Sequence, residues 1–195
     1  MKKYILVSLT LLLFLFLYNK LGIETNKEIA SLSLKPEHDI IAIAVVEKTK
    51  RYPIINLSGW SRGVPDTIKM EGEIYFYNIK EKEIKKISSV KIPKDWSKEG
   101  YNLSLYIWDK DGVYFTLENC FNRNCEENYH YFLEKNGKIK NIKSLPKLSK
   151  SYSESIREKT VYKTYQNNEL NISIGKSGDW KPVLVFRDGK LEPIY

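Results

Sequence analysis

Histidine and cysteine are scarce in this sequence, and their scarcity excludes several kinds of site. Two His and two Cys occur among 195 residues. His38 and His130 lie far apart, and no second Cys pair or nearby His pair completes a zinc site with them. The sequence also lacks a Gly-x-Ser-x-Gly elbow and a glycine-rich phosphate loop. We therefore predict no catalytic, metal-binding or cofactor-binding residue, and no cofactor.

An apolar leader at the amino terminus predicts export. Lys2 and Lys3 precede an apolar run over residues 4–18, and Asn19 and Lys20 close it. This order is typical of the basic and hydrophobic regions of a secretory signal. We expect residues 1–20 to be a signal sequence or an uncleaved membrane anchor.

The residues after the leader favour an anchor over cleavage. The nearby candidate cleavage sites place Lys20 or Glu28 where a small residue is needed, and no Cys follows for lipid attachment. As a helix the run covers about 22 Å, which is short of a hydrocarbon core of about 30 Å and requires local thinning or snorkelling. We predict an inner-membrane protein facing the periplasm or the extracellular side, or a soluble periplasmic or secreted protein if the leader is cleaved.

The two cysteines are consistent with an oxidising compartment. Cys120 and Cys125 flank a short polar loop, and their four intervening residues do not match the Cys-x-x-Cys spacing of redox and metal sites. We predict a structural disulfide between them rather than metal or redox chemistry. Closing so small a loop contributes about 2 kcal/mol.

Nucleic acid is not an expected partner, although the formal net charge is +8. Lys alternates with Glu, as in residues 80–83, and does not gather into one basic block. Export also separates the chain from nucleic acid.

The remaining residues predict an all-β domain of antiparallel hairpin meanders. Fourteen Tyr and four Trp favour pleated, half-buried surfaces. Residues 21–37 are polar without a sustained period and predict a linker, whereas residues 38–195 alternate short apolar runs with turns. Three dipeptides supply the positive φ angles of tight hairpins: Asp111-Gly112, Asn136-Gly137 and Asp188-Gly189. Helix signals are nearly absent after the leader.

A hairpin pattern recurs at about 55-residue intervals. The three copies cover roughly residues 39–87, 103–142 and 161–195, which resemble four-stranded blades. Propeller-like blades and a β-sandwich both suit this length.

Three tryptophans in loop-like contexts are the best surface candidates. Trp60, Trp96 and Trp180 are accompanied by Arg62 and Lys181, and together these residues suit a binding face for a protein or a glycan. The alternative is that each Trp closes the end of a sheet as a core anchor.

These features favour an exported, envelope-associated, non-enzymatic binding protein whose partner is another envelope or secreted protein. Immunity, inhibitor and adaptor roles all fit. The alternative is a secreted or anchored hydrolase acting on envelope glycans, with a triad assembled in space or with loop carboxylates such as Asp95, Asp179 or Glu118.

Overall fold

The computed structural model is almost entirely antiparallel β-structure, which confirms the all-β prediction. It describes residues 9–10, 13, 23–52, 66–92, 101–121, 124–166, 169–176 and 178–195. The predicted leader, including residues 4–18, lies almost wholly outside this set. Within the described residues no helix is long and apolar enough to cross a membrane.

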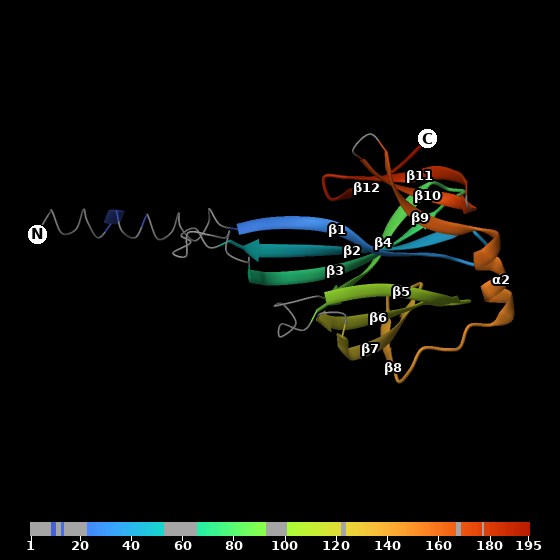
Figure 1. The fold of residues 1–195 in the computed structure, drawn as a ribbon, viewed down its shortest axis with the longest axis horizontal. Helices are drawn as coiled ribbons and strands as arrows, with labels where there is room; N and C mark the ends of the chain where they lie inside the picture. The colour runs from blue at the N-terminus through green and yellow to red at the C-terminus, as the bar shows by residue number, and fades with distance from the viewer. Residues whose placement is uncertain are drawn as a thin grey trace, which may run out of the picture.

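The strands form three four-stranded sheets, and each sheet follows the order of the chain (Figure 1). The first sheet contains β1 (Ile23–Leu34), β2 (Ile40–Arg51), β3 (Asp66–Asn78) and β4 (Glu83–Lys91). The second sheet contains β5 (Tyr101–Asp109), β6 (Gly112–Phe121), β7 (Asn124–Glu134) and β8 (Ile139–Ile142). The third sheet contains β9 (Thr160–Gln166), β10 (Glu169–Lys176), β11 (Asp179–Arg187) and β12 (Lys190–Pro193).

The first sheet is the middle layer because β2 is buried on both faces. Strand side chains alternate between faces, so Ile41, Ile43 and Val45 pack toward Ile172, Ile174 and Leu184 of the third sheet. The intervening side chains of β2 pack on the second sheet: Ala42, Ala44 and Val46. Figure 1 shows the second and third sheets on opposite sides of the first.

The prediction of a linker over residues 21–37 is wrong for most of its length, because residues 23–34 form β1 and pair with β2. The polar composition of residues 24–28 gave no strand pattern in the sequence. Lys27 pairs across the ladder with Glu47, and Glu28 accepts a hydrogen bond from Lys48. Cross-strand ion pairs let an exposed strand end be polar. The β-structure therefore begins at Ile23 rather than at His38.

The helix α2 (Lys150–Glu158) connects the second and third sheets and was not predicted. Ser149 caps it by accepting a hydrogen bond from the Tyr152 N–H at 3.1 Å. Few apolar residues mark the segment, and the buried Tyr152 ties it to the domain. Tertiary contact therefore decides this helix more than its sequence pattern does.

Two of the three predicted turns have the expected backbone. Gly137 has φ +91°, and Asp188 and Gly189 have φ +50° and +75°, as a tight hairpin requires. Gly112 is different, because it already pairs with Asp109 in the ladder. A Cβ there would lie 2.0 Å from the Leu133 carbonyl oxygen, so close approach of β7 explains that glycine.

A charged row crosses the first sheet beyond its apolar centre. Lys27 Nζ lies 3.1 Å from Glu47 and 3.7 Å from Glu73, and Glu73 also binds Lys86 and the Tyr75 hydroxyl. Burial alone would raise the pKa of Glu73, but the hydrogen bonds from Lys86 and Tyr75 and the charges of Lys86 and Lys27 outweigh it. The pKa therefore lies below its ordinary 4.5.

This depressed pKa predicts acid sensitivity. Ionised Glu73 contributes stability that is fully present above about pH 4.5 and is lost as pH falls through the lower folded-state pKa. Urea unfolding of Glu73→Gln between pH 6 and pH 3 should show a smaller loss of stability with acid than the unmodified protein. Glu81→Gln, an exposed change in the β3–β4 turn, is the control; equal pH profiles for both variants would contradict the assignment.

Candidate binding surface

An aromatic pair lies on the outer face of the third sheet. Tyr162 of β9 and Trp180 of β11 have ring centroids 5.5 Å apart with a tilt of 35°. They meet across β10, where Trp180 is opposite Gly175. Tyr162 is opposite Ser173, two residues earlier on β10, so the two rings form a diagonal pair across the strand. We call Tyr162 and Trp180 the aromatic pair.

The aromatic pair belongs to neither hydrophobic core. Ile172 and Ile174 point from β10 toward the first sheet, so the intervening Ser173 and the flanking aromatic residues face outward. Tyr162 is 59% exposed, and Trp180 is half-buried. Large aromatic rings on an outer sheet face are available to a partner.

The structure separates the residues that the sequence suggested as a surface. Trp180 and Lys181 are adjacent on β11, so their side chains leave opposite faces of the strand. Trp60, Arg62 and Trp96 lie outside the described residues. The fourth tryptophan, Trp108, was not a surface candidate, and it lies in the core.

Two exposed tyrosines of β9 were not predicted as site residues. Tyr162 and Tyr165 are 59% and 79% exposed. Their segment reads Thr-Val-Tyr-Lys-Thr-Tyr-Gln, an aromatic strand with polar alternation. That pattern indicated a strand, but only the order of strands in the sheet shows that it lies at an edge.

A groove of about 480 Å³ separates β9 from β1. Its walls are Ala30, Ser31, Leu32, Val161, Tyr162, Lys163 and Tyr165. Lys163 crosses the groove, and its Nζ donates to the Ile29 carbonyl oxygen at 2.9 Å. That carbonyl lies beside the register shift between Ile29 and Ser31. The groove therefore lies between Tyr162, one member of the aromatic pair, and β1 of the middle layer.

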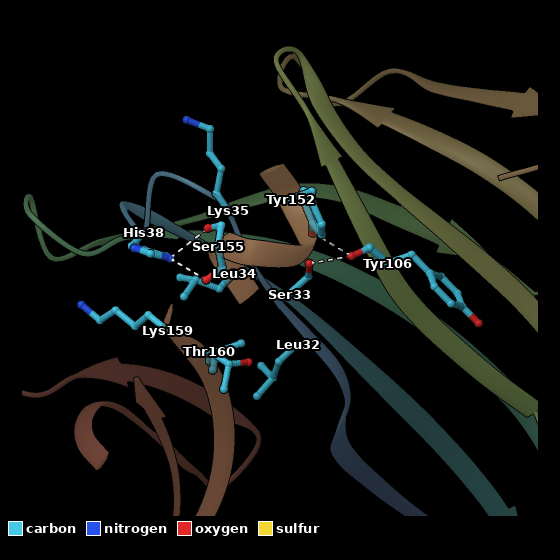
Figure 2. A pocket seen from close by; sticks show the side chains of 11 residues that line it. Leu32, Ser33, Leu34, Lys35, His38, Tyr106, Tyr152, Ser155, Lys159 and Thr160 are labelled. Carbon is cyan, nitrogen blue, oxygen red and sulfur yellow. Dashed lines mark hydrogen bonds between the residues drawn. The ribbon is translucent and has the colours of Figure 1, made fainter. Parts of the chain in front are cut away.

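A second cavity, of about 170 Å³, shares Leu32 and Val161 with the groove and continues it toward α2 (Figure 2). Hydroxyl groups hold one wall of this cavity together. Ser33 Oγ and the Tyr152 hydroxyl donate to the Tyr106 carbonyl oxygen at 3.0 and 3.2 Å. Burial raises the pKa of Tyr152, so its hydroxyl stays protonated. These bonds join β1, β5 and α2.

His38 and Ser155 meet at the opposite wall of this cavity, as Figure 2 shows. His38 Nε2 lies 3.1 Å from Ser155 Oγ and 3.3 Å from the Ser155 carbonyl oxygen. Ser155 Oγ donates its proton to the Pro36 carbonyl oxygen at 2.8 Å. His38 Nε2 must then carry a proton and donate to Ser155.

This arrangement does not activate Ser155 as a nucleophile. A general base must offer Ser155 the unprotonated nitrogen and accept the hydroxyl proton. Here the hydroxyl donates to a main-chain carbonyl group instead. In the described part of the chain, no carboxylate hydrogen-bonds His38 to orient it as a triad acid would. The His38–Ser155 contact fastens the β1–β2 turn to α2.

The carboxylates named for a hydrolase do not converge either. Glu118 lies on β6 of the second sheet, where it accepts a hydrogen bond from the Tyr106 hydroxyl at 3.0 Å. Asp179 lies on β11 of the third sheet, on the other side of the first sheet (Figure 1). Asp95 is outside the described residues. Glu118 and Asp179 therefore do not form one site.

The backbone register bears on the predicted disulfide. Cys120 of β6 and Cys125 of β7 are direct partners in the ladder, although their side chains lie outside what the structure describes. Cα atoms of directly opposed residues are about 4.5–5.5 Å apart, and disulfides join Cα atoms about 4.4–6.8 Å apart. The pairing remains a prediction that this register permits.

Thiol labelling tests the pairing. The unreduced, denatured full-length protein should take up no label, and the reduced protein should take up label at both Cys120 and Cys125. Cys120→Ser should lower the free energy of unfolding by about 2 kcal/mol, and adding Cys125→Ser should lower it little further because the bridge is already absent. Labelling of both thiols before reduction would contradict the prediction.

Comparisons with known proteins do not supply a family: no family model matches the chain, and neither a curated protein nor a solved structure matches it significantly.

Proposed function

We propose that this chain is an exported, envelope-associated, non-enzymatic protein that binds another envelope or secreted protein. An immunity, inhibitor or adaptor role suits such a protein. Residues 4–18 would anchor it in the membrane, with the β-domain on the periplasmic or extracellular side. If the leader is cleaved, the same domain would act as a soluble protein.

The observation that carries this proposal is the aromatic pair. Tyr162 and Trp180 contact each other on an outer sheet face and lie outside both cores. Trp and Tyr contribute large, rigid contact surfaces and dominate many protein interfaces. An exposed Tyr162 side chain contributes little to the stability of the folded domain, so contact with a partner protein better explains why the ring lies at the surface.

We propose a blade-like arrangement for the scaffold. Each sheet is a meander of four consecutive strands, and β1 lies against β5 and β9, which are the first strands of the other two sheets. First strands that gather at a centre are typical of propeller blades rather than of a two-layer sandwich. An experimental structure in which β5 and β9 lay away from β1 would contradict this arrangement.

The hydrolase alternative has less support. The Ser155 hydroxyl donates to the Pro36 carbonyl group, and Glu118 and Asp179 lie on different sheets. We therefore treat the His38–Ser155 contact as structural in this proposal. Turnover of envelope glycans by the purified protein, lost on Ser155→Ala, would favour the hydrolase instead.

Affinity capture from native envelope and secreted fractions tests the proposed function. Full-length protein in mild detergent serves as bait, together with a Tyr162→Ala/Trp180→Ala variant. We expect one dominant, stoichiometric protein on the unmodified bait and at least a tenfold loss of it on the variant. Neither change enters a core, so the variant should keep its far-ultraviolet circular dichroism spectrum.

The second sheet offers a matched control. Tyr114 and Phe132 form a similar aromatic pair there, with ring centroids 4.7 Å apart. Tyr114→Ala should retain the captured protein. Equal loss of the protein on both variants, or retention on the Tyr162→Ala/Trp180→Ala bait, would exclude the aromatic pair as the contact surface. An empty eluate from the unmodified bait would contradict the binding function itself.

A further inference from the structure

The outer edge of β9 carries backbone groups without a strand partner. β9 ends the strand order of the third sheet. Gln166 pairs with Glu169 across a two-residue connection, and such a closing pair exchanges both hydrogen bonds. Pairs at intervals of two do the same, so the N–H and C=O groups of Val161, Lys163 and Tyr165 point away from β10. Within the described residues, no other backbone group bonds them.

The other edges of the described sheets are short, covered or protected by lysines. β8 and β12 have four residues each. The β1 and β5 edges meet each other: Ser31 Oγ of β1 accepts from the Leu105 N–H of β5, and Trp108 Nε1 of β5 donates to the Ser33 carbonyl oxygen of β1. β4 carries Lys85, Lys86 and Lys91, and lysines protect edges from pairing. β9 also has a lysine, but the Lys163 side chain bends across the groove to Ile29.

The surroundings of this edge are basic. Lys35, Lys159 and Lys163 line the groove and the adjoining cavity, and neither lining includes an Asp or Glu. Lys35 is neutralised by Glu37 and Asp39 at 3.3 and 3.4 Å. Lys159 and Lys163 have no carboxylate within ion-pair distance in the described part of the chain. The ammonium groups of Lys159 and Lys163 can therefore form ion pairs with acidic groups of a partner that lies along this edge.

We propose that β9 accepts an extended, acidic segment of the partner protein as an added strand. Main-chain bonds to Val161, Lys163 and Tyr165 would hold the segment, and carboxylates would meet Lys159 and Lys163. A second copy of this chain suits the edge less well, because antiparallel pairing centred on Lys163 opposes two lysines. This inference rests on the proposed function and names the chemistry of the partner.

Peptides test strand addition without knowledge of the partner. A displayed library of random seven-residue peptides is selected on full-length protein in mild detergent. We expect enriched peptides to be acidic and free of proline. In a synthetic copy of the best peptide, N-methylation of alternate residues should weaken binding at least tenfold, whereas N-methylation of the intervening residues should change it less than threefold. Amide exchange should slow at Val161, Lys163 and Tyr165.

Charge reversal tests the acidic preference. Lys159→Glu should weaken binding of the selected peptide at least tenfold, and it leaves the hydrogen bond from Lys163 to Ile29 in place. Lys176→Glu, an exposed change on the same sheet, is the control and should have less than a twofold effect. The inference would be overturned if no peptide were enriched, or if the enriched peptides contained proline or carried no charge. It would also be overturned if N-methylation did not weaken binding, or if the β9 amides were not protected from exchange. A captured envelope protein that needs the aromatic pair but leaves the β9 amides unprotected would overturn it while the proposed function stands.

Discussion

Replacement of Trp108 with Ala should lower the free energy of unfolding by about 3–5 kcal/mol, which corresponds to a Tm decrease of about 6–20 °C. Trp108 is 5% exposed, and its ring centroid lies 5.0 Å from that of Phe76 in the first sheet. The indole therefore fills the core between the first and second sheets. Urea unfolding followed by far-ultraviolet circular dichroism measures the change without using tryptophan fluorescence.

A conservative variant separates packing from hydrogen bonding at this position. Trp108 Nε1 donates to the Ser33 carbonyl oxygen at 3.3 Å. Trp108→Phe keeps an aromatic ring in the core but leaves that carbonyl without its donor, so we expect a loss of about 1–3 kcal/mol. A loss under 1 kcal/mol for Trp108→Ala would show that the second sheet does not pack on the first as described.

Replacement of Gly175 with Ala should destabilise the third sheet and displace the aromatic pair. A Cβ at Gly175 would lie 1.9 Å from the Asp179 carbonyl oxygen and 3.2 Å from the Trp180 Cα, so β11 must move. We expect a loss of about 3 kcal/mol, at the upper end for overpacking. Because Trp180 moves with its backbone, capture of the partner should also fall. Urea unfolding and the capture assay measure the two effects.

Gly178 provides a control in the same hairpin. Its φ of +94° makes Ala unfavourable there, but a Cβ would meet no atom within 4 Å. Gly178→Ala should therefore cost about 1–2 kcal/mol through backbone strain alone and should leave partner capture unchanged. If Gly175→Ala proved no more harmful than Gly178→Ala, the close approach of β11 to β10 would be refuted.

The hairpins were largely predictable because their signals are local. Asp188-Gly189 and Asn136-Gly137 favour positive φ angles whatever surrounds them, and short apolar runs beside such turns pair with their neighbours. The predicted units over residues 103–142 and 161–195 accordingly lie close to the second and third sheets. β1 and α2 were missed because their signals are not local. Glu28 and Lys27 of β1 are matched by β2, and α2 depends on the buried Tyr152.

The candidate site was predictable only in part. Trp180 stood out as a scarce aromatic residue in a polar context, but nothing nearby in the sequence indicates that it meets Tyr162. That contact requires the registers of β9 and β11 against β10, which place the two residues on one face across the same strand. Lys181, its sequence neighbour, faces the other way because successive side chains of a strand alternate between its two faces.

The sequence by itself determined the class of structure, the position of most turns and the expectation of export. These depend on composition and on contacts within a few residues, such as hairpin turns and the apolar run over residues 4–18. The tertiary structure alone decided which strands lie at edges, that β2 is buried on both faces, and that Tyr162 and Lys163 border one groove with Leu32. These features join residues distant in the chain, whose spacing carries no local signal.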